Sequence, residues 1–147
     1  MERCMTQYTR ILLVVDLTET SQAIARRAAE LSRQNGAALR VLHVVEFIPV
    51  EPMTETLMPP AGVETQLIER ARQKLADLAA TCGIPADACR VETGNVKAEI
   101  LRAARELPAD LIVLGGRERH GVSILVNFTE DTVLHAAPCD VLAVRVK

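Results

Sequence analysis

The sequence has few aromatic residues, almost no excess of charge and no long apolar run. Aromatic side chains make up 2% of its 147 residues, Trp is absent, and 17 Lys and Arg stand against 19 Asp and Glu. With so few aromatic rings there is no stacking platform for single-stranded nucleic acid, and a near-neutral chain has no general attraction for a polyanion. No apolar run approaches the ~20 residues that a membrane span requires. We therefore expect neither a nucleic-acid nor a membrane partner.

The cysteine patterns of zinc sites and of disulfide-rich secreted proteins are also missing. The four cysteines are spread over the chain, at Cys4, Cys82, Cys89 and Cys139. Zinc ligands come at short paired spacings, and small secreted domains carry a denser cysteine framework. Residues 1–9 are polar and do not resemble a secretory signal. These features predict reduced thiols, no metal site and a cytoplasmic location.

What the sequence does have is an aliphatic, alanine-rich composition, with 49% hydrophobic residues. The length predicts a single domain over residues 1–147. Short, continuous apolar runs predict strands that are buried on both faces, while apolar residues at every third or fourth position predict helices. The predicted strands are 11–15, 38–45, 89–93, 111–114 and 141–146. We place 89–93 near an edge of the sheet, because its pattern is the weakest.

Four helices are predicted between these strands. The first is capped by Thr18 or Thr20 and stops at Gly36, the second spans 63–82, the third is capped by Asn95, and the last ends before Pro138. Gly115 and Gly116 are expected to break the fourth strand. A long loop covers 47–60, which is either functional or mobile at that length.

The alternation of strands and helices predicts an α/β fold: a single doubly wound five-stranded parallel sheet with helices on both faces. In a nucleotide-binding-like order, 3-2-1-4-5, the ligand crevice lies beyond the carboxyl ends of the first and fourth strands. The turns that begin at Asp16 and Gly115 would then face one crevice. A flavodoxin-like order would place the crevice elsewhere.

Candidate chemistry gathers at these two turns. The carboxylate of Asp16 could hold a bound molecule or cap its own turn, and the spacing leaves both open. Gly116 begins a Gly-x-x-x-x-Gly pattern, but the lysine of a phosphate-binding loop does not follow it, so the Walker A match fails. Backbone N–H groups after Gly115, with Arg117 and Arg119, could still hold an anion; a solvated charged loop is the alternative.

The predicted start of the last helix argues against phosphate binding, and no catalytic set is present. Asn127 and Glu130 have capping-box spacing. Glu130 and Asp131 in the first turn offset the positive helix end and would repel a polyphosphate. The histidines fall in separate elements, and the serines lack a G-x-S-x-G context. His43 lies inside a strand, where a packing or hydrogen-bonding role is expected.

Over nearly its whole length the chain resembles the universal stress protein family. The resemblance is carried by the segments RILLVVDLTETS (10–21), LHVV (42–45), ADLIVLG (109–115) and HAAPCDVLAVR (135–145). In nucleotide-binding members, the family pattern assigns the nucleoside to the acid after the first strand and to a valine of the second. It assigns the phosphates to three glycines. By position, Asp16 corresponds to this acid, Val44 to the valine and Gly115 to the first of the three glycines.

The other two phosphate glycines of the family are absent. Their positions correspond to Glu118 and Asn127, which makes the chain similar to the A-type branch, whose members lack the phosphate motif. Asp140, the residue before the predicted last strand, is also similar to the residue that the A-type branch has there. If a nucleotide binds, the resemblance and the loop chemistry together place it against Asp16, Val44, Gly115, Gly116, Arg117, Arg119 and Asn127.

The resemblance implies a non-enzymatic, cytoplasmic stress-response protein without a cofactor or tight ATP binding, paired as a homodimer through its last strand. That strand would offer an apolar edge formed by Val141, Leu142, Val144 and Val146. The alternative is an ATP- or AMP-binding switch with weak affinity. A phospho-accepting receiver domain fits poorly, because Asp16 has no acidic neighbour. The sequence does not identify a protein client.

Overall fold

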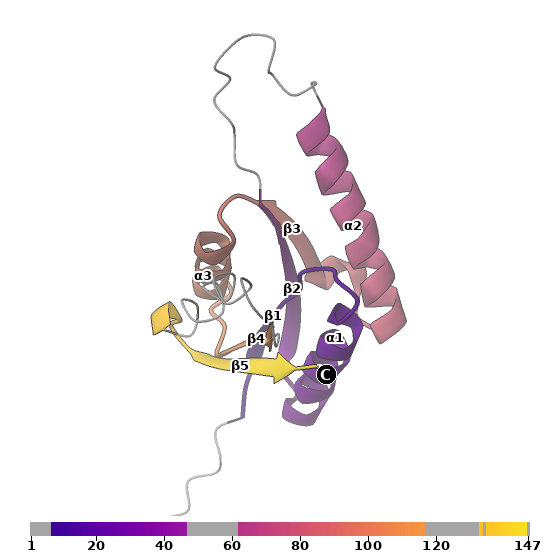
Figure 1. Ribbon diagram of the computed structural model, residues 1–147. Coiled ribbons are helices and arrows are strands. Elements are labelled where there is room, and N and C mark those ends of the chain that lie inside the picture. Colours follow the sequence, from indigo (N-terminus) through magenta and orange to yellow (C-terminus); the bar gives the residue numbers. More distant parts are fainter. Residues whose placement is uncertain (1–6, 47–61, 117–132, 134, 147) are drawn as a thin grey trace, which may run out of the picture.

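The computed structural model of the chain describes residues 7–46, 62–116, 133 and 135–146 (Figure 1). Its strands are β1 (Arg10–Val14), β2 (Ala38–Val45), β3 (Cys89–Thr93), β4 (Leu111–Gly116) and β5 (Asp140–Arg145). Its helices are α1 (Ser21–Asn35), α2 (Val63–Cys82) and α3 (Val96–Glu106), with a short 3-10 turn, η2 (Ala86–Ala88). Residues 133, 135 and 136 are helical as well.

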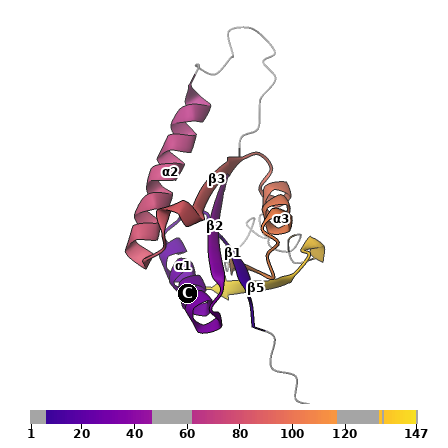
Figure 2. The same ribbon diagram turned by 180° about the vertical axis from the view of Figure 1, so that it is seen from behind.

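The strands form one parallel sheet in the order β3-β2-β1-β4-β5. This confirms the predicted nucleotide-binding-like order and places Cys89–Thr93 at an edge. Helices α1 and α2 cover one face of the sheet and α3 covers the other (Figures 1 and 2).

The core lies on both faces of the central strand β1. Ile11 and Leu13 are buried in a cluster with residues of α1 and α2, including Ala28. Leu12, between them, is buried in a second cluster with Ile100 of α3. Successive side chains of a strand point to opposite faces, so an unbroken apolar run suits a strand that is covered on both sides.

Several strand ends differ from the prediction. β1 and β5 each begin and end one residue earlier than expected, because Arg10 pairs with Ala38 and Asp140 with Leu111. β4 does not break at its two glycines; these continue the ladder opposite Val144 and Arg145. Pairing with a neighbouring strand therefore overrides the local preference of glycine for a turn.

The helix ends follow the sequence except at the start of α1. Gly36 ends α1 with a φ of 63°, and the side chain of Asn95 caps α3 by accepting a 2.9 Å hydrogen bond from the N–H of Ala98. The predicted threonine cap of α1 is wrong: Thr20 is in the helical region (φ −83°, ψ −12°) and makes no side-chain cap. The hydrogen bonds of this turn go to Asp16 instead.

A second carboxylate ties down the amino end of β1. One oxygen of Asp110 accepts hydrogen bonds from the N–H and the hydroxyl of Thr9, both at 2.8 Å, and the other accepts one from the N–H of Arg10 at 3.0 Å. Burial alone would raise the pKa of Asp110, but these hydrogen bonds outweigh it and hold the pKa below its usual value. The nearby Tyr8 hydroxyl donates to Asp140 at 2.9 Å.

Candidate functional site

The strand order brings three predicted site residues to the carboxyl edge of the sheet. Val14 pairs with Leu42 and Leu13 with Val113. Continuing these registers by two residues sets Asp16 level with Val44, and Gly115 level with Val15. The pairing of β1 with β4 therefore brings the turn after β1 beside the end of β4, and the loop that follows Gly116 lies outside the described residues.

Asp16 caps its own turn, as one of the two sequence interpretations proposed. Its Oδ1 accepts from the N–H of Thr18 at 3.2 Å, from the Thr18 hydroxyl at 2.7 Å and from the Ser21 hydroxyl at 3.0 Å. Between them Leu17 has a φ of 57°, which is uncommon for a residue other than glycine. This oxygen is thus engaged by the β1–α1 turn before any ligand arrives.

Of the two partners of Asp16, the sequence analysis named Thr18 only as a helix cap and did not single out Ser21. Ser21 is 2% exposed, and its hydroxyl both donates to Asp16 and accepts from the N–H of Thr18 at 3.1 Å. The signal was present as an aspartate followed two residues later by a threonine, the spacing of an Asx turn. Because the turn lies directly at the start of α1, it replaces a conventional threonine cap.

Val44 and His43 serve the packing of β2. Val44 is 7% exposed and belongs to the cluster beneath α3, with Leu114 of β4. The ring of His43 donates from Nδ1 to the carbonyl of Val15 at 2.8 Å, which confirms the expected hydrogen-bonding role. The packing of Val44 and the hydrogen bond of His43 therefore explain both residues without a ligand.

Gly115 is explained by the close approach of α1 to β4. A Cβ atom at this position would lie 2.5 Å from Cδ1 of Ile24, which is far too close for two carbon atoms. Its glycine character therefore follows from packing between α1 and β4. The same residue holds the first glycine position of the family pattern.

The remaining predicted nucleotide contacts fall on other parts of the chain. Gly116 ends β4 opposite Arg145 of β5. Arg117, Arg119 and Asn127 lie outside the described residues, as does the predicted capping box at Asn127. The described part of the site therefore consists of the turn at Asp16, the end of β2 and the end of β4.

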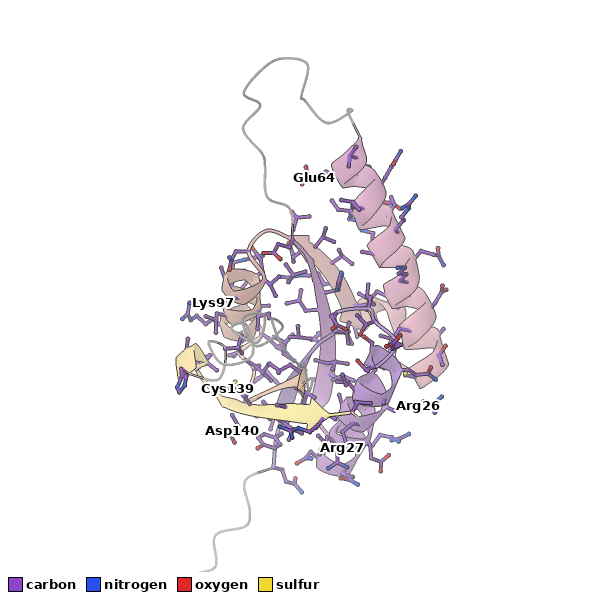
Figure 3. The ribbon with its side chains drawn as sticks, viewed as in Figure 1. Arg26, Arg27, Glu64, Lys97, Cys139 and Asp140 are labelled. Atoms are coloured by element: carbon purple, nitrogen blue, oxygen red, sulfur yellow. The ribbon has the colours of Figure 1, made fainter. Side chains whose placement is uncertain are left out.

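The predicted dimer edge, β5, lies at the end of the sheet. Figure 3 labels Cys139 and Asp140 at its beginning. Val141 packs partly against the core beneath α3, while Leu142, Val144 and Val146 pack partly against the core on the side of α1. All four side chains are only half-buried, so β5 presents apolar surface on both faces of the sheet.

Three further observations on the described residues concern their thiols, metal binding and membrane spans. Burial raises the pKa of the Cys89 and Cys139 thiols, with nearby Asp87 and Asp140 adding to the effect, so both stay protonated near neutral pH. Within the described ranges, no group of three or more His, Cys, Asp or Glu is placed to hold a metal ion. No helix in these ranges is long and apolar enough to cross a membrane.

Comparison with known proteins gives matches along the whole described fold. The model of the universal stress protein family matches residues 7–145. Universal stress protein A homolog 1 of Coxiella burnetii is 37% identical over 141 residues, covering 95% of this chain and 98% of the relative. Homolog 2 of the same organism is 35% identical, covering 97% and 99%.

Solved structures agree with these matches. The universal stress protein UspA from Lactobacillus plantarum has a TM-score of 0.66 and 28% identity, covering 95% of this chain and 99% of that one. A crystal structure described as a universal stress protein in complex with cAMP has a TM-score of 0.65, covering 95% and 98%. At 18% identity, this second likeness shows a shared fold.

Proposed function

Because the chain belongs to the universal stress protein family, we propose that it is a non-enzymatic, cytoplasmic stress-response protein without tight ATP binding. We further propose that it acts as a homodimer joined through β5. The family membership rests on the match over residues 7–145 and on relatives above 30% identity. The remaining parts of the proposal rest on the residues of the carboxyl edge and of β5.

The turn at Asp16 is the observation that carries the proposal of weak nucleotide binding. Oδ1 of this carboxylate already accepts hydrogen bonds from Thr18 and Ser21. A nucleoside that used the same oxygen would have to displace contacts that hold the start of α1. Displacing a hydrogen bond to a charged group costs about 1.5–3 kcal/mol, which weakens binding by one to two orders of magnitude.

The sequence of the phosphate segment supports the same proposal. Glu118 and Asn127 stand at positions where nucleotide-binding members of the family have glycine. A carboxylate beside a triphosphate is repelled by it, and a side chain prevents the close backbone approach that glycine allows. Of the three phosphate glycines of the family only Gly115 is present, and its close packing against Ile24 requires a glycine there independently of any phosphate.

Isothermal titration of nucleotide-free protein with Mg-ATP tests this part of the proposal. We expect no binding heat at micromolar concentrations. A dissociation constant of about 1 μM, or ~8 kcal/mol of binding free energy, would overturn it. The triple variant Glu118→Gly, Asn127→Gly, Phe128→Ser is the positive control: it restores the two missing glycines and the serine that follows the last glycine in nucleotide-binding members, over a stretch one residue shorter than in the family, and is expected to gain affinity.

Apolar side chains on β5 support the proposed dimer. Among the described residues β5 pairs with β4 on one side, and its half-buried valines lie on both faces of the sheet. An edge strand of this kind pairs readily with another strand. A second copy related by two-fold symmetry would present the same strand and so cover both sets of side chains. Sedimentation equilibrium should give twice the 16.0 kDa of one chain. A single-chain mass at micromolar concentration would contradict the dimer.

A nucleotide-dependent switch is the second candidate. It is favoured by the level placement of Asp16, Val44 and Gly115 at one edge, and by the fold shared with a universal stress protein in complex with cAMP. Titration with cAMP and AMP separates the two candidates. If either binds at micromolar concentration, and if Asp16→Ala with Arg117→Ala removes that binding, the switch is the better description.

A further inference from the structure

The outer edge of β3 has hydrogen-bonding groups that face away from the sheet. The N–H of Gly94 donates to the carbonyl of Val45 at 3.1 Å, so the backbone of Gly94 faces β2. Alternate residues of a parallel strand face the same neighbour, which points the backbone groups of Val91 and Thr93 outward. Among the described residues, β2 is the one strand beside β3.

A cavity lies on each side of this edge. The first, here called the α3-side cavity, has a volume of about 470 Å³ and a floor that includes Leu12, Leu42 and Ala103. The second, the α2-side cavity, has a volume of about 310 Å³ and is lined by Leu75 and other apolar residues of α2 and β3. Cys89 and Arg90 of β3 line both cavities, so the strand forms the wall between them.

The two cavities differ in charge. Two arginines line the α2-side cavity, Arg72 and Arg90; the guanidinium of Arg90 pairs with glutamates on the face that carries α3, so Arg72 supplies the positive charge on the α2 side. The α3-side cavity balances Arg40 and Arg90 against Asp87 and Glu106 over its apolar floor. An acidic side chain therefore suits the α2 side, and an apolar side chain suits the α3 side.

The ion pairs around β3 leave room for such an acidic group on the α2 side. Arg90 binds Glu92 at 2.7 Å and Glu106 at 3.2 Å, on the face that carries α3. Arg72 pairs at 3.0 Å with Glu69 of its own helix, and both side chains are more than 60% exposed. An exposed pair of this kind contributes little free energy, so Arg72 can exchange its partner at small cost.

We propose that the outer edge of β3 binds an extended segment of a partner protein that carries acidic and apolar residues at alternating positions. A strand added to β3 would direct successive side chains to opposite faces of the sheet. Its acidic residues would then enter the α2-side cavity and its apolar residues the α3-side cavity. Main-chain hydrogen bonds supply affinity in this mode, and the cavities for alternate side chains supply specificity.

This site is separate from the nucleotide edge and from the proposed dimer edge. Cys89 and Arg90 lie at the amino end of β3, whereas Asp16 and Gly115 lie at the carboxyl ends of β1 and β4. β5 lies at the opposite end of the sheet. Peptide binding at β3 can therefore be tested without reference to nucleotide affinity or to the oligomeric state.

Fluorescence anisotropy with two labelled nine-residue peptides provides the first test. One peptide alternates Glu and Leu, and the other alternates Lys and Leu. We expect the Glu–Leu peptide to bind, and the Lys–Leu peptide to bind at least about tenfold more weakly, a difference of ~1.4 kcal/mol. Equal affinity for both peptides, or no binding of the Glu–Leu peptide, would overturn the proposal.

The variant Val91→Pro tests the backbone edge. Proline removes an N–H that faces away from β2, so the ladder between β2 and β3 keeps its bonds while the added strand loses one. We expect at least about tenfold weaker binding of the Glu–Leu peptide. Methylating alternate backbone nitrogens of the peptide blocks the same contact without changing the protein, and should weaken binding equally. Unchanged affinity in that second experiment would overturn the proposal even if Val91→Pro does not fold.

The variant Arg72→Gln tests the charge of the α2-side cavity. Its matched control is Arg26→Gln on α1, an exposed arginine that does not line either cavity (Figure 3). We expect Arg72→Gln to weaken the Glu–Leu peptide about tenfold and Arg26→Gln to leave it unchanged. Equal losses in both variants would mean attraction to general positive charge, which contradicts the proposed site.

Discussion

The two edge strands of the sheet differ in what covers them. Helices α2 and α3 both pack against β3, whereas the extensive contacts of β5 within the described chain are with β4 alone (Figure 2). Both faces of β3 are therefore covered by helices, and its backbone edge, with a cavity on each side, is the part left for a partner. β5 keeps half-buried side chains such as Val144 on the surface. Strands at equivalent positions in one sheet are thus suited to different partners: an extended peptide at β3 and a second copy at β5.

The largest effect is expected on dimerisation, when a lysine in β5 is compared with a lysine in β3. Val144→Lys would bury an unpaired ammonium group in the proposed dimer, at a cost of about 3 kcal/mol or more, so we expect the dimer to weaken at least ~hundredfold. Val91→Lys is the matched control, because Val91 is a half-buried valine of the other edge strand. Sedimentation equilibrium measures both. A dimer that dissociates with Val91→Lys and survives Val144→Lys would reverse the assignment of the two edges.

The second-largest effect, a loss of stability, is expected from a substitution in β4, the strand that pairs with β5. In Gly115→Ala the new methyl group would meet Ile24 at 2.5 Å, and overpacking of this kind costs about 1–3 kcal/mol. Urea denaturation should show that loss. The double variant with Ile24→Val removes the clashing methyl and should recover part of the stability. A single variant as stable as the parent would show that α1 moves away without cost.

A smaller effect is expected at the amino ends of β1 and β5, where Asp110 and Tyr8 act. The pKa of Asp110 is lower in the folded chain than its ordinary value of ~3.9. Its contribution to stability is therefore complete above that ordinary value and is lost as the pH falls through the folded value. Asp110→Asn should lower stability by ~1 kcal/mol at pH 7 and reduce the loss of stability in acid.

Urea titrations of both proteins at neutral and acid pH measure this difference. Tyr8→Phe serves as the control, because it removes the hydrogen bond to Asp140 while leaving Asp110 and its partners in place. An acid dependence that is the same in Asp110→Asn and in the parent would contradict the role given to this carboxylate.

The smallest effect is expected from the charges beside β3. Arg102 pairs with Glu99, with Glu106 at 2.7 Å and with Glu92 at 3.5 Å, while Arg90 joins the last two. Hydrogen bonds from Arg90 and Arg102 lower the pKa of Glu106. These groups are solvated, so Arg102→Gln should shift the urea midpoint slightly, and about 1 M salt should remove the shift. A shift that persists in salt would mean that the network is structural rather than a solvated surface.

Elements with strong local signals could be predicted from the sequence. The helix over 63–82 matches α2 in both bounds, because its apolar stripe and Gly83 mark it locally. The cap at Asn95 and the edge position of Cys89–Thr93 were also predicted correctly. In each case the residues that determine the element lie close together in the sequence.

Features that depend on distant residues could not be predicted in this way. Asp110 holds Thr9 and Arg10 across about a hundred residues, and nothing in either segment signals that contact. The extension of β4 through Gly115 and Gly116 depends on pairing with β5. The glycine at 115 fits a phosphate site in the sequence, while the fold shows its contact with Ile24. A phosphate site and close packing between a helix and a strand can thus each require glycine at the same position.

Hydrogen exchange of the two edge strands, followed by NMR at several protein concentrations, tests the central comparison most directly. We expect the β5 amides that face away from β4 to become protected as the dimer forms. We expect the amides of Val91 and Thr93 to exchange rapidly at every concentration and to become protected when the Glu–Leu peptide is added. Protection of Val91 and Thr93 that rises with protein concentration, with β5 amides that stay unprotected, would contradict the assignment of the two edges.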